Sequence, residues 1–172
     1  MSRRRQLMGY GAQKRAAYRL SSRLVKTSIY QKSQHIACYW PVNGEIELHS
    51  LIKSAWAQGK TCYLPVLNQQ QLSFVHYTPT SLMKLNRFGI PEPVTGRVIQ
   101  PQNLDLVLMP LVVFDKHHHR VGMGGGYYDK TFACASPYRG VYLMGVAHRC
   151  QQVRMIRPEP WDVVLDQVLT DE

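Results

Sequence analysis

Residues 106–114 read Leu-Val-Leu-Met-Pro-Leu-Val-Val-Phe, and residues 122–130 read Gly-Met-Gly-Gly-Gly-Tyr-Tyr-Asp-Lys. The first stretch is the longest strictly apolar run in the chain, and it predicts a strand or a strand pair buried on both faces. The second stretch predicts a glycine loop followed by the start of a helix. This order is typical of a phosphate site, because glycine lets backbone N–H groups converge on an anion. A glycine-rich turn without any ligand is the alternative.

Two well-known phosphate loops do not fit this segment. A P-loop requires Gly-Lys followed by Ser or Thr, and the chain contains no such triplet. The dinucleotide fingerprint requires a third glycine where Tyr127 stands, and a carboxylate about twenty residues later. No acidic residue lies between Asp129 and Glu159. A nucleotide would therefore have to bind here in another way.

Predicted helices and strands alternate along the rest of the chain. Helices are expected at residues 12–29, at 48–58 and after Gly126, and strands at 35–40, 61–66, 72–77, 106–110, 140–146 and 163–169. Residues 78–103 contain four prolines and are expected to form a long, ordered excursion. The alternation predicts an α/β fold, layered α/β/α and Rossmann-like, with a largely parallel central sheet. The length of 172 residues predicts a single domain over residues 1–172.

Positive charge is concentrated near the N-terminus. Residues 1–44 contain nine Lys or Arg and no Asp or Glu, so they contribute +9 of the net charge of +10. The other 128 residues, with twelve Lys or Arg and eleven Asp or Glu, balance to +1. Such an excess indicates either an anionic partner or a solvated helix face. Nucleic acid, an acidic membrane surface and a polyphosphate are the candidate partners.

Hydropathy and cysteine spacing indicate a cytoplasmic protein. No apolar run approaches the roughly 20 residues that span a membrane, and no apolar segment follows the basic N-terminus as in a secretory signal. The chain has no Cys-x-x-Cys pair, so its cysteines are expected to be reduced thiols: Cys38, Cys62, Cys134 and Cys150.

The segment Arg120–Lys130 resembles the signature of the 5-formyltetrahydrofolate cyclo-ligase family, also called methenyltetrahydrofolate synthetases. Further stretches are similar to family elements in the same order: Asn43–Glu47, Gly59–Pro65, Gly89–Pro93, Leu106–Pro110 and Phe114–Asp115. The resemblance runs from about Arg5 to Thr170. It implies an enzyme that uses ATP and Mg²⁺ to convert 5-formyltetrahydrofolate into 5,10-methenyltetrahydrofolate, with release of ADP and phosphate. It also implies a cytoplasmic monomer whose partners are a reduced folate and ATP, without nucleic acid or membrane.

The resemblance further implies a role for individual residues. Backbone donors that cradle phosphate and pterin would come from Gly122, Gly124, Gly125 and Gly126. Other ATP contacts would come from Arg3, Arg4, Arg5, Arg120 and Tyr128, and folate contacts from Trp40, Glu45, Met123 and Tyr127. Arg120 and Tyr127 are the expected catalytic residues. Magnesium would be held by Asp129 and Asp166, since this ion prefers carboxylate and phosphate oxygens.

Several of these residues have plainer alternatives. Asp129 could simply complement a helix start, Trp40 could be a core residue, and Glu45 could be a solvated turn residue. Family members usually begin with a helix that carries Lys-x-x-x-Arg, but here the alignment reaches Met1 before that Lys. Either the cluster at residues 3–5 replaces it, or this reading frame starts late and omits part of the ATP site.

The histidine run 117–119 is the second departure, because His118 occupies a position where the family commonly has a turn glycine. Three consecutive side chains on a regular strand alternate in direction and cannot all face one metal ion, so the run is expected to be a solvated loop. Two alternative functions stay open at this point. One is a basic nucleic-acid-binding module, and the other is a family member with impaired turnover.

Overall fold

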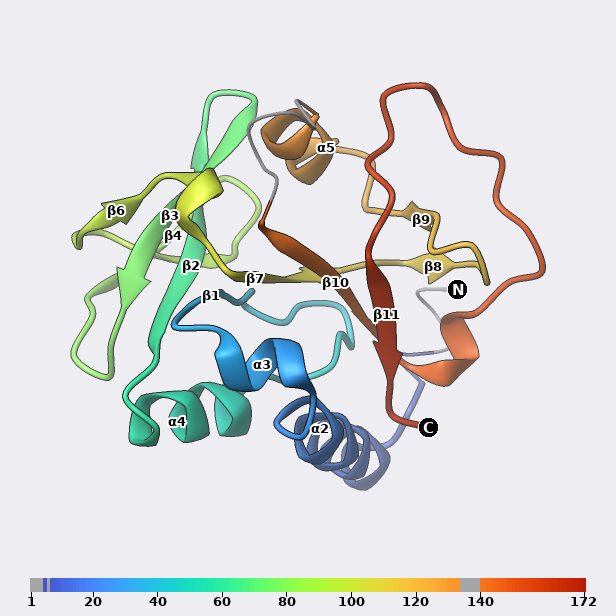
Figure 1. Ribbon diagram of the computed structural model, residues 1–172, viewed down its shortest axis with the longest axis horizontal. Helices are drawn as coiled ribbons and strands as arrows, with labels where there is room; N and C mark the ends of the chain where they lie inside the picture. The colour runs from blue at the N-terminus through green and yellow to red at the C-terminus, as the bar shows by residue number, and fades with distance from the viewer. Residues whose placement is uncertain (1–4, 6, 134–139) are drawn as a thin grey trace.

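The computed structural model describes residues 5, 7–133 and 140–172, and its centre is a seven-stranded sheet with the order β11-β10-β7-β1-β2-β3-β6 (Figure 1). The strands are β1 (His35–Ala37), β2 (Thr61–Asn68), β3 (Gln71–Tyr77), β6 (Val98–Ile99), β7 (Leu106–Pro110), β10 (Tyr142–Ala147) and β11 (Gln167–Thr170). All pairings from β11 to β2 are parallel, and only β3 and β6 join the sheet as antiparallel strands. The predicted largely parallel sheet is confirmed.

The parallel strands contain a topological switch point between β1 and β7. From β1 the chain adds β2 on one side, and then returns to add β7, β10 and β11 on the other side. In sheets wound in this way, the loops after the two strands at the switch point diverge and leave a crevice at their carboxyl ends. This topology locates the expected ligand site after Ala37 and after Pro110.

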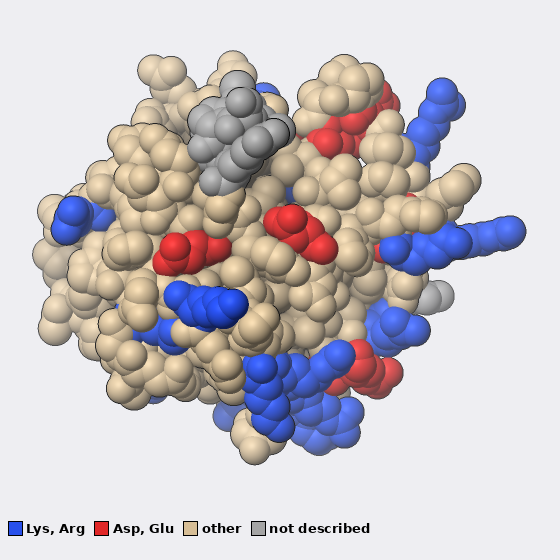
Figure 2. All heavy atoms as spheres, in the orientation of Figure 1, with Lys and Arg blue, Asp and Glu red and all other residues tan. Residues whose placement is uncertain are grey.

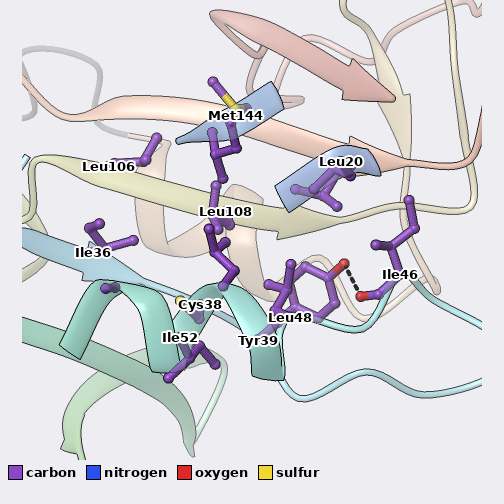
Figure 3. Close-up of a cluster of buried hydrophobic side chains, with 14 of the residues drawn as sticks. Leu20, Ile36, Cys38, Tyr39, Ile46, Leu48, Ile52, Leu106, Leu108 and Met144 are labelled. Atoms are coloured by element: carbon purple, nitrogen blue, oxygen red, sulfur yellow. Dashed lines mark hydrogen bonds between the residues drawn. The ribbon is translucent and has the colours of Figure 1, made fainter. Parts of the chain in front are cut away.

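One face of the sheet is covered by α2 (Tyr10–Leu24), α3 (Ser28–Lys32) and α4 (His49–Ala57) (Figure 1). Leu20 from α2 and Ile52 from α4 belong to the same buried cluster as Ile36 and Leu108 from the sheet (Figure 3). Within this cluster the hydroxyl of Tyr39 donates a 2.8 Å hydrogen bond to the carbonyl of Ile46 (Figure 3). That bond satisfies a polar group that would otherwise be buried at a cost.

The other face of the sheet is covered by α5 (Tyr127–Phe132) and by irregular segments. Phe132 from α5 packs against Phe74 in β3, with ring centroids 5.9 Å apart. Leu111 and Leu165 complete this second core from segments without regular structure. The predicted layered fold is confirmed, and its second outer layer is thin in the described part of the chain.

Three predicted elements differ from the observed ones. The strand expected at residues 163–169 covers only Gln167–Thr170. The helix expected at residues 12–29 is divided, because Thr27 ends the turn after α2 and its Oγ1 accepts a hydrogen bond from the N–H of Tyr30, which starts α3. The strand expected at residues 35–40 ends at Ala37, although the N–H of Cys38 still bonds to Tyr63. The chain then leaves the sheet toward the switch point.

The excursion at residues 78–103 is ordered, as predicted. It contains a hairpin of β4 (Met83–Leu85) and β5 (Pro91–Pro93), then β6, then a short 3₁₀ helix, η1 (Pro101–Asn103). The apolar run at residues 106–114 forms β7 and then β8 (Val113–Phe114), which pairs with β9 (Arg120–Val121). A second 3₁₀ helix, η2, covers Arg149–Gln151.

Candidate functional site

A cavity of about 620 Å³ opens at the switch point of the sheet. Trp40 lies after β1 and contributes to its wall, as do Leu64 of β2 and Leu111 after β7. Further parts of the wall come from the β4–β5 hairpin, the glycine loop and the start of α5. This volume is typical of sites for small molecules, and the position is the one that the topology predicts.

The glycine loop, residues 122–126, presents free backbone donors to this cavity. Gly122, Gly125 and Gly126 line the cavity, whereas Gly124 belongs to the loop without lining it. Gly124 and Gly126 have φ angles of 91° and 62°, which other residues rarely adopt. Among the described residues, none accepts a hydrogen bond from a backbone N–H of the loop. The backbone donors of the loop are therefore available to a ligand such as an anion.

Tyr127 packs tightly on the loop. A Cβ atom added to Gly125 would lie 2.6 Å from the Tyr127 ring, which real Cβ atoms essentially never do. Glycine at this position therefore permits the ring to lie directly against the loop backbone.

Arg120 and Asp129 form an ion pair at the edge of the cavity. Arg120 Nη2 lies 2.7 Å from Asp129 Oδ1, and both residues line the cavity. The same Oδ1 accepts a 3.1 Å hydrogen bond from the N–H of Val163, and Arg120 also donates to the Val163 carbonyl. Asp129 Oδ2 has no hydrogen-bond partner in the described part of the chain. One oxygen of this carboxylate is therefore available to water or to a cation.

The carboxylates fit a magnesium ion only in part. No three His, Cys, Asp or Glu side chains among the described residues are close enough to hold a metal ion together. Magnesium commonly uses one or two carboxylates together with phosphate oxygens and water, so Asp129 alone is compatible with it. Asp166 is exposed at the amino end of β11, does not line the cavity, and accepts a 2.7 Å hydrogen bond from the N–H of Leu143. The structure does not bring Asp166 to the cavity beside Asp129.

Glu45 lies in the cavity wall with a buried carboxylate. Its Oε2 accepts a 3.1 Å hydrogen bond from the N–H of Val42, and its Oε1 lies 3.6 Å from Arg5 Nη2. Burial raises the pKa of Glu45 to about 7, against the opposing effects of the Val42 hydrogen bond and the Arg5 charge. Because its side chain is buried, Glu45 is not the solvated turn residue that the sequence left as an alternative. Its raised pKa means that the carboxyl can gain or lose a proton near neutral pH.

Arg5 supports the cavity from behind. Its side chain is 1% exposed, with Nε donating to the Asn43 carbonyl at 2.9 Å and Nη1 donating to the Leu111 carbonyl at 2.8 Å. These bonds tie together the loops after β1 and β7. The prediction that Arg5 binds ATP stays a prediction, but in this structure its donors are occupied by protein acceptors. Arg3 and Arg4 lie outside the described residues.

Aromatic side chains give the cavity flat apolar surfaces. Trp40 lines one side and packs edge-on against His49, with ring centroids 4.9 Å apart. Tyr127 also lines the cavity and packs edge-on against Phe88, with ring centroids 6.2 Å apart.

Tyr128 also lines the cavity. Burial raises the pKa of its hydroxyl, and the nearby Glu45 raises it further. Such a lining suits a planar ligand with a few polar groups. Met123, which is 63% exposed, lines the mouth.

The tip of the β4–β5 hairpin is a part of the site that the sequence did not reveal. Asn86, Phe88 and Ile90 line the cavity, as does Glu92. Glu92 Oε1 accepts hydrogen bonds from the N–H of Leu67 at 2.9 Å and from Asn86 Nδ2 at 2.7 Å. The stretch Gly89–Pro93 is similar to a family element, but this similarity did not indicate that the hairpin contributes to the site.

The histidine run is a loop, as predicted. Buried Asp115 organises it, since its Oδ1 accepts from the N–H groups of His117 and His119 at 2.9 and 3.1 Å, and its Oδ2 accepts from Ile156 at 2.9 Å. Burial opposes ionisation of Asp115, but these bonds and the His119 side chain lower its pKa to about 2. His118 has a φ of 65°, which explains a preference for glycine at this position.

The basic residues of α2 lie on the helix side of the sheet. Lys14, Arg15 and Arg19 are exposed on α2, and Figure 2 shows Lys and Arg gathered at the lower edge, where Figure 1 places this helix. Arg23 is also exposed and donates a 2.8 Å hydrogen bond to the Thr170 carbonyl. None of these side chains lines the cavity. No described helix is both long enough and apolar enough to span a bilayer.

Comparisons with known proteins point to one family. The model of the 5-formyltetrahydrofolate cyclo-ligase family matches residues 1–171. The chain is 41% identical over 144 residues to the 5-formyltetrahydrofolate cyclo-ligase of Haemophilus influenzae, covering 81% of this chain and 76% of that protein. It is 39% identical over 140 residues to the enzyme of the same name from Escherichia coli K12, covering 78% and 76%.

The fold is also similar to solved structures. The NMR structure of 5,10-methenyltetrahydrofolate synthetase from Aquifex aeolicus superposes with a TM-score of 0.86 at 27% identity, covering 99% of this chain and 86% of that one. The synthetase from Mycoplasma pneumoniae has a TM-score of 0.81 at 21% identity, covering 99% and 94%, and supports the fold.

Proposed function

The chain belongs to the 5-formyltetrahydrofolate cyclo-ligase family, and on that basis we propose that it converts 5-formyltetrahydrofolate into 5,10-methenyltetrahydrofolate with ATP and Mg²⁺. ADP and phosphate are the other products. The observation that carries this proposal is the glycine loop: its amides donate to no described residue, and it borders a cavity that Glu45 and Trp40 also line. A phosphate donor and a planar folate can thus share one cavity. The comparisons favour this function over the nucleic-acid-binding alternative.

The phosphate end of ATP is proposed to bind at the glycine loop. The four glycines of residues 122–126 supply N–H donors that no side chain of their own obstructs, and Arg120 supplies a guanidinium in the wall of the same cavity. Donors that are already in place stabilise the charge of a transferring phosphoryl group without reorganisation. Tyr128 is proposed to contact the nucleotide from the first turn of α5.

Asp129 is proposed to hold Mg²⁺ through Oδ2, the oxygen that is not engaged by Arg120. A bound Mg²⁺ would neutralise negative charge on phosphate oxygens. Asp166 as a second ligand stays a prediction that the variants described in the Discussion test.

The folate is proposed to lie with its planar pterin between the aromatic walls of the cavity. Glu45 accepts hydrogen bonds from the pterin when it is ionised and can donate one when it is protonated. The rings of Trp40 and Tyr127 pack against the pterin ring. Deep placement of the ring excludes water from the reacting atoms, which strengthens the electrostatic contacts around them.

The reaction then follows from positioning. The formyl oxygen attacks the γ-phosphorus of ATP, the bond to the ADP oxygen breaks, and ADP leaves. The neighbouring anilino nitrogen attacks the activated formyl carbon and gives up its N–H proton to solvent. The carbon–oxygen bond to phosphate breaks, phosphate leaves, and the methenyl bridge closes. Arg120 and the loop amides hold the transferring group during both steps.

The proposed enzyme acts as one domain of residues 1–172, as a monomer in the cytoplasm. Cys38 and Cys62 are free and buried, which fits a reducing compartment. Cys134 lies outside the described residues.

The direct test is the appearance of the methenyl product, followed by its absorbance. Purified protein is incubated with 5-formyltetrahydrofolate, ATP and MgCl₂, with single omissions of ATP or MgCl₂ as controls. Product is expected only in the complete mixture. Folded protein that yields no product under these conditions would indicate the family member with impaired turnover.

A further inference from the structure

Arg87 borders the cavity without itself lining it. It lies at the tip of the β4–β5 hairpin, between Asn86 and Phe88 of the cavity wall, and its side chain is exposed. Its Nη2 donates a hydrogen bond to the hydroxyl of Tyr127, which lines the cavity. The guanidinium carbon is 5.1 Å from the centroid of the Phe88 ring and 6.0 Å from that of Tyr127. The cation is thus held between two aromatic rings that border the opening.

The position of Arg87 is fixed by the loop that carries it. Asn86 Oδ1 accepts hydrogen bonds from the N–H groups of Phe88 at 2.8 Å and Ile90 at 3.1 Å. The Asn86 amide also donates to Glu92, which in turn is bound to the backbone of β2 at Leu67. These bonds close the tip and attach it to the main sheet. The backbone that carries the Arg87 guanidinium is therefore already ordered, so less conformational entropy is lost when Arg87 binds a ligand.

The charges of the other arginines at the cavity are balanced by carboxylates. Arg120 is paired with Asp129, and Arg5 behind the wall is paired with Glu45. Arg87 has no acidic partner among the described residues, and its hydrogen-bond acceptor is a neutral phenol. Its positive charge is available to an anionic group of a ligand.

We infer that Arg87 binds a carboxylate of the folate's glutamyl group at the mouth of the cavity and so sets the specificity for glutamylated substrates. This inference rests on the proposed function. The planar part of a reduced folate can be buried, whereas its glutamyl carboxylates are costly to desolvate and stay near solvent. A guanidinium matches a carboxylate with two parallel hydrogen bonds. On binding, Arg87 exchanges its bond to the Tyr127 phenol for a stronger, charge-assisted bond.

The test compares 5-formyltetrahydrofolate with the primary amide of 5-formyltetrahydropteroate (called the pteroate below). The amide lacks the glutamyl group and carries no benzoate carboxylate that could take its place. The variant is Arg87→Gln, and the matched control is Lys84→Gln, which removes an exposed cation from the same hairpin. Unlike Arg87, Lys84 makes no hydrogen bond or cation–π contact with Phe88 or Tyr127. Arg87→Gln is expected to raise the KM for the folate about tenfold, with an unchanged KM for the pteroate and for ATP. Lys84→Gln is expected to change none of these. Arg87→Lys should restore part of the loss, since it keeps the charge without the paired donors.

Three results would overturn the inference: no change of KM in Arg87→Gln, an equal rise for both folates, or a rise for ATP, which would assign Arg87 to phosphate. A binding measurement by tryptophan fluorescence runs in parallel. If wild type binds the folate more tightly than the pteroate and Arg87→Gln removes the difference, the inference holds even without turnover. Equal wild-type affinity for both contradicts it. Wild type that binds neither folate contradicts the proposed function itself.

Discussion

Arg120 Nη2 lies 2.7 Å from Asp129 Oδ1, and both side chains line the cavity that the glycine loop borders. The pair joins a candidate phosphate ligand from β9 to a candidate metal ligand from the first turn of α5. Because one oxygen of Asp129 is engaged by Arg120, the carboxylate is held in a fixed orientation while its second oxygen stays available. Arg120 is therefore proposed both to meet phosphate and to orient the metal ligand.

Asp129→Asn is expected to lower kcat/KM about 100-fold and to raise the Mg²⁺ concentration that gives half of the maximal rate. The amide keeps the shape of the side chain but loses the charge that attracts the cation. Asp166→Asn is the matched variant and is expected to change kcat/KM by less than about threefold, because its carboxylate bonds to Leu143 away from the cavity. Unchanged Mg²⁺ dependence in Asp129→Asn would remove that residue from the metal shell. An equal effect in both variants would support the two-carboxylate site.

Gly125→Ala is expected to impair catalysis by displacing the Tyr127 ring, which the new Cβ would meet at 2.6 Å. We expect kcat/KM to fall at least tenfold and the melting temperature to drop by a few degrees. Gly122→Ala adds the same methyl group where no other atom lies within 4 Å, so its melting temperature should stay near that of wild type. Thermal unfolding and initial rates measure both variants. Equal melting temperatures in the two variants would show that the Tyr127 ring moves away from the new Cβ atom without loss of stability.

Much of this arrangement was predictable, because apolar runs and glycine positions report local structure. The buried strand β7, in the apolar run at residues 106–114, and the glycine loop after that run follow from the order of elements. Long-range pairing was not predictable. Arg5 was expected to bind phosphate as part of a basic cluster, yet its guanidinium is buried beside Glu45, 40 residues later in the chain. Sequence spacing does not specify which charges meet across loops.

The hairpin at the cavity mouth shows a second limit. Residues 78–103 lack hydrophobic periodicity. The sequence therefore predicted that this segment is ordered, but not where it lies relative to the sheet and the cavity. The hairpin tip is closed by the Asn86 side chain, and β2 fixes it through Glu92. Such side-chain bonds to the backbone leave no periodic signal in the sequence, and therefore the role of Arg87 emerged only from the structure.

Glu45→Gln is expected to change how stability depends on pH. The pKa of Glu45 is raised from 4.5 to about 7, so between these values the folded protein holds a proton that the unfolded chain has lost. The free energy of unfolding of wild type therefore falls across this range as pH rises, whereas glutamine does not titrate. Relative to the variant, wild type should lose roughly 2–3 kcal/mol between pH 4.5 and 7.5. Urea unfolding at several pH values measures this difference, and a constant difference would place the pKa near its ordinary value.

His118→Gly is expected to stabilise the protein by about 0.5 kcal/mol, because glycine adopts the left-handed backbone of this position without a Cβ clash. His117→Gly is the control, since His117 is not in that region. It should destabilise the protein by about 0.5–1 kcal/mol through the greater flexibility of the unfolded chain. Denaturant unfolding compares the two, and a loss of stability in both variants would count against strain at His118.

The central claim is that the backbone amides of the glycine loop bind the phosphates of ATP. Its most direct test is a titration of ¹⁵N-labelled protein with a non-hydrolysable ATP analogue and Mg²⁺, followed by the amide signals of Gly122, Gly124, Gly125 and Gly126. We predict that these signals shift with the same saturation curve as the rest of the site. If they stay unchanged at saturation while amides elsewhere shift, the nucleotide binds in another place and the proposed role of the loop is wrong.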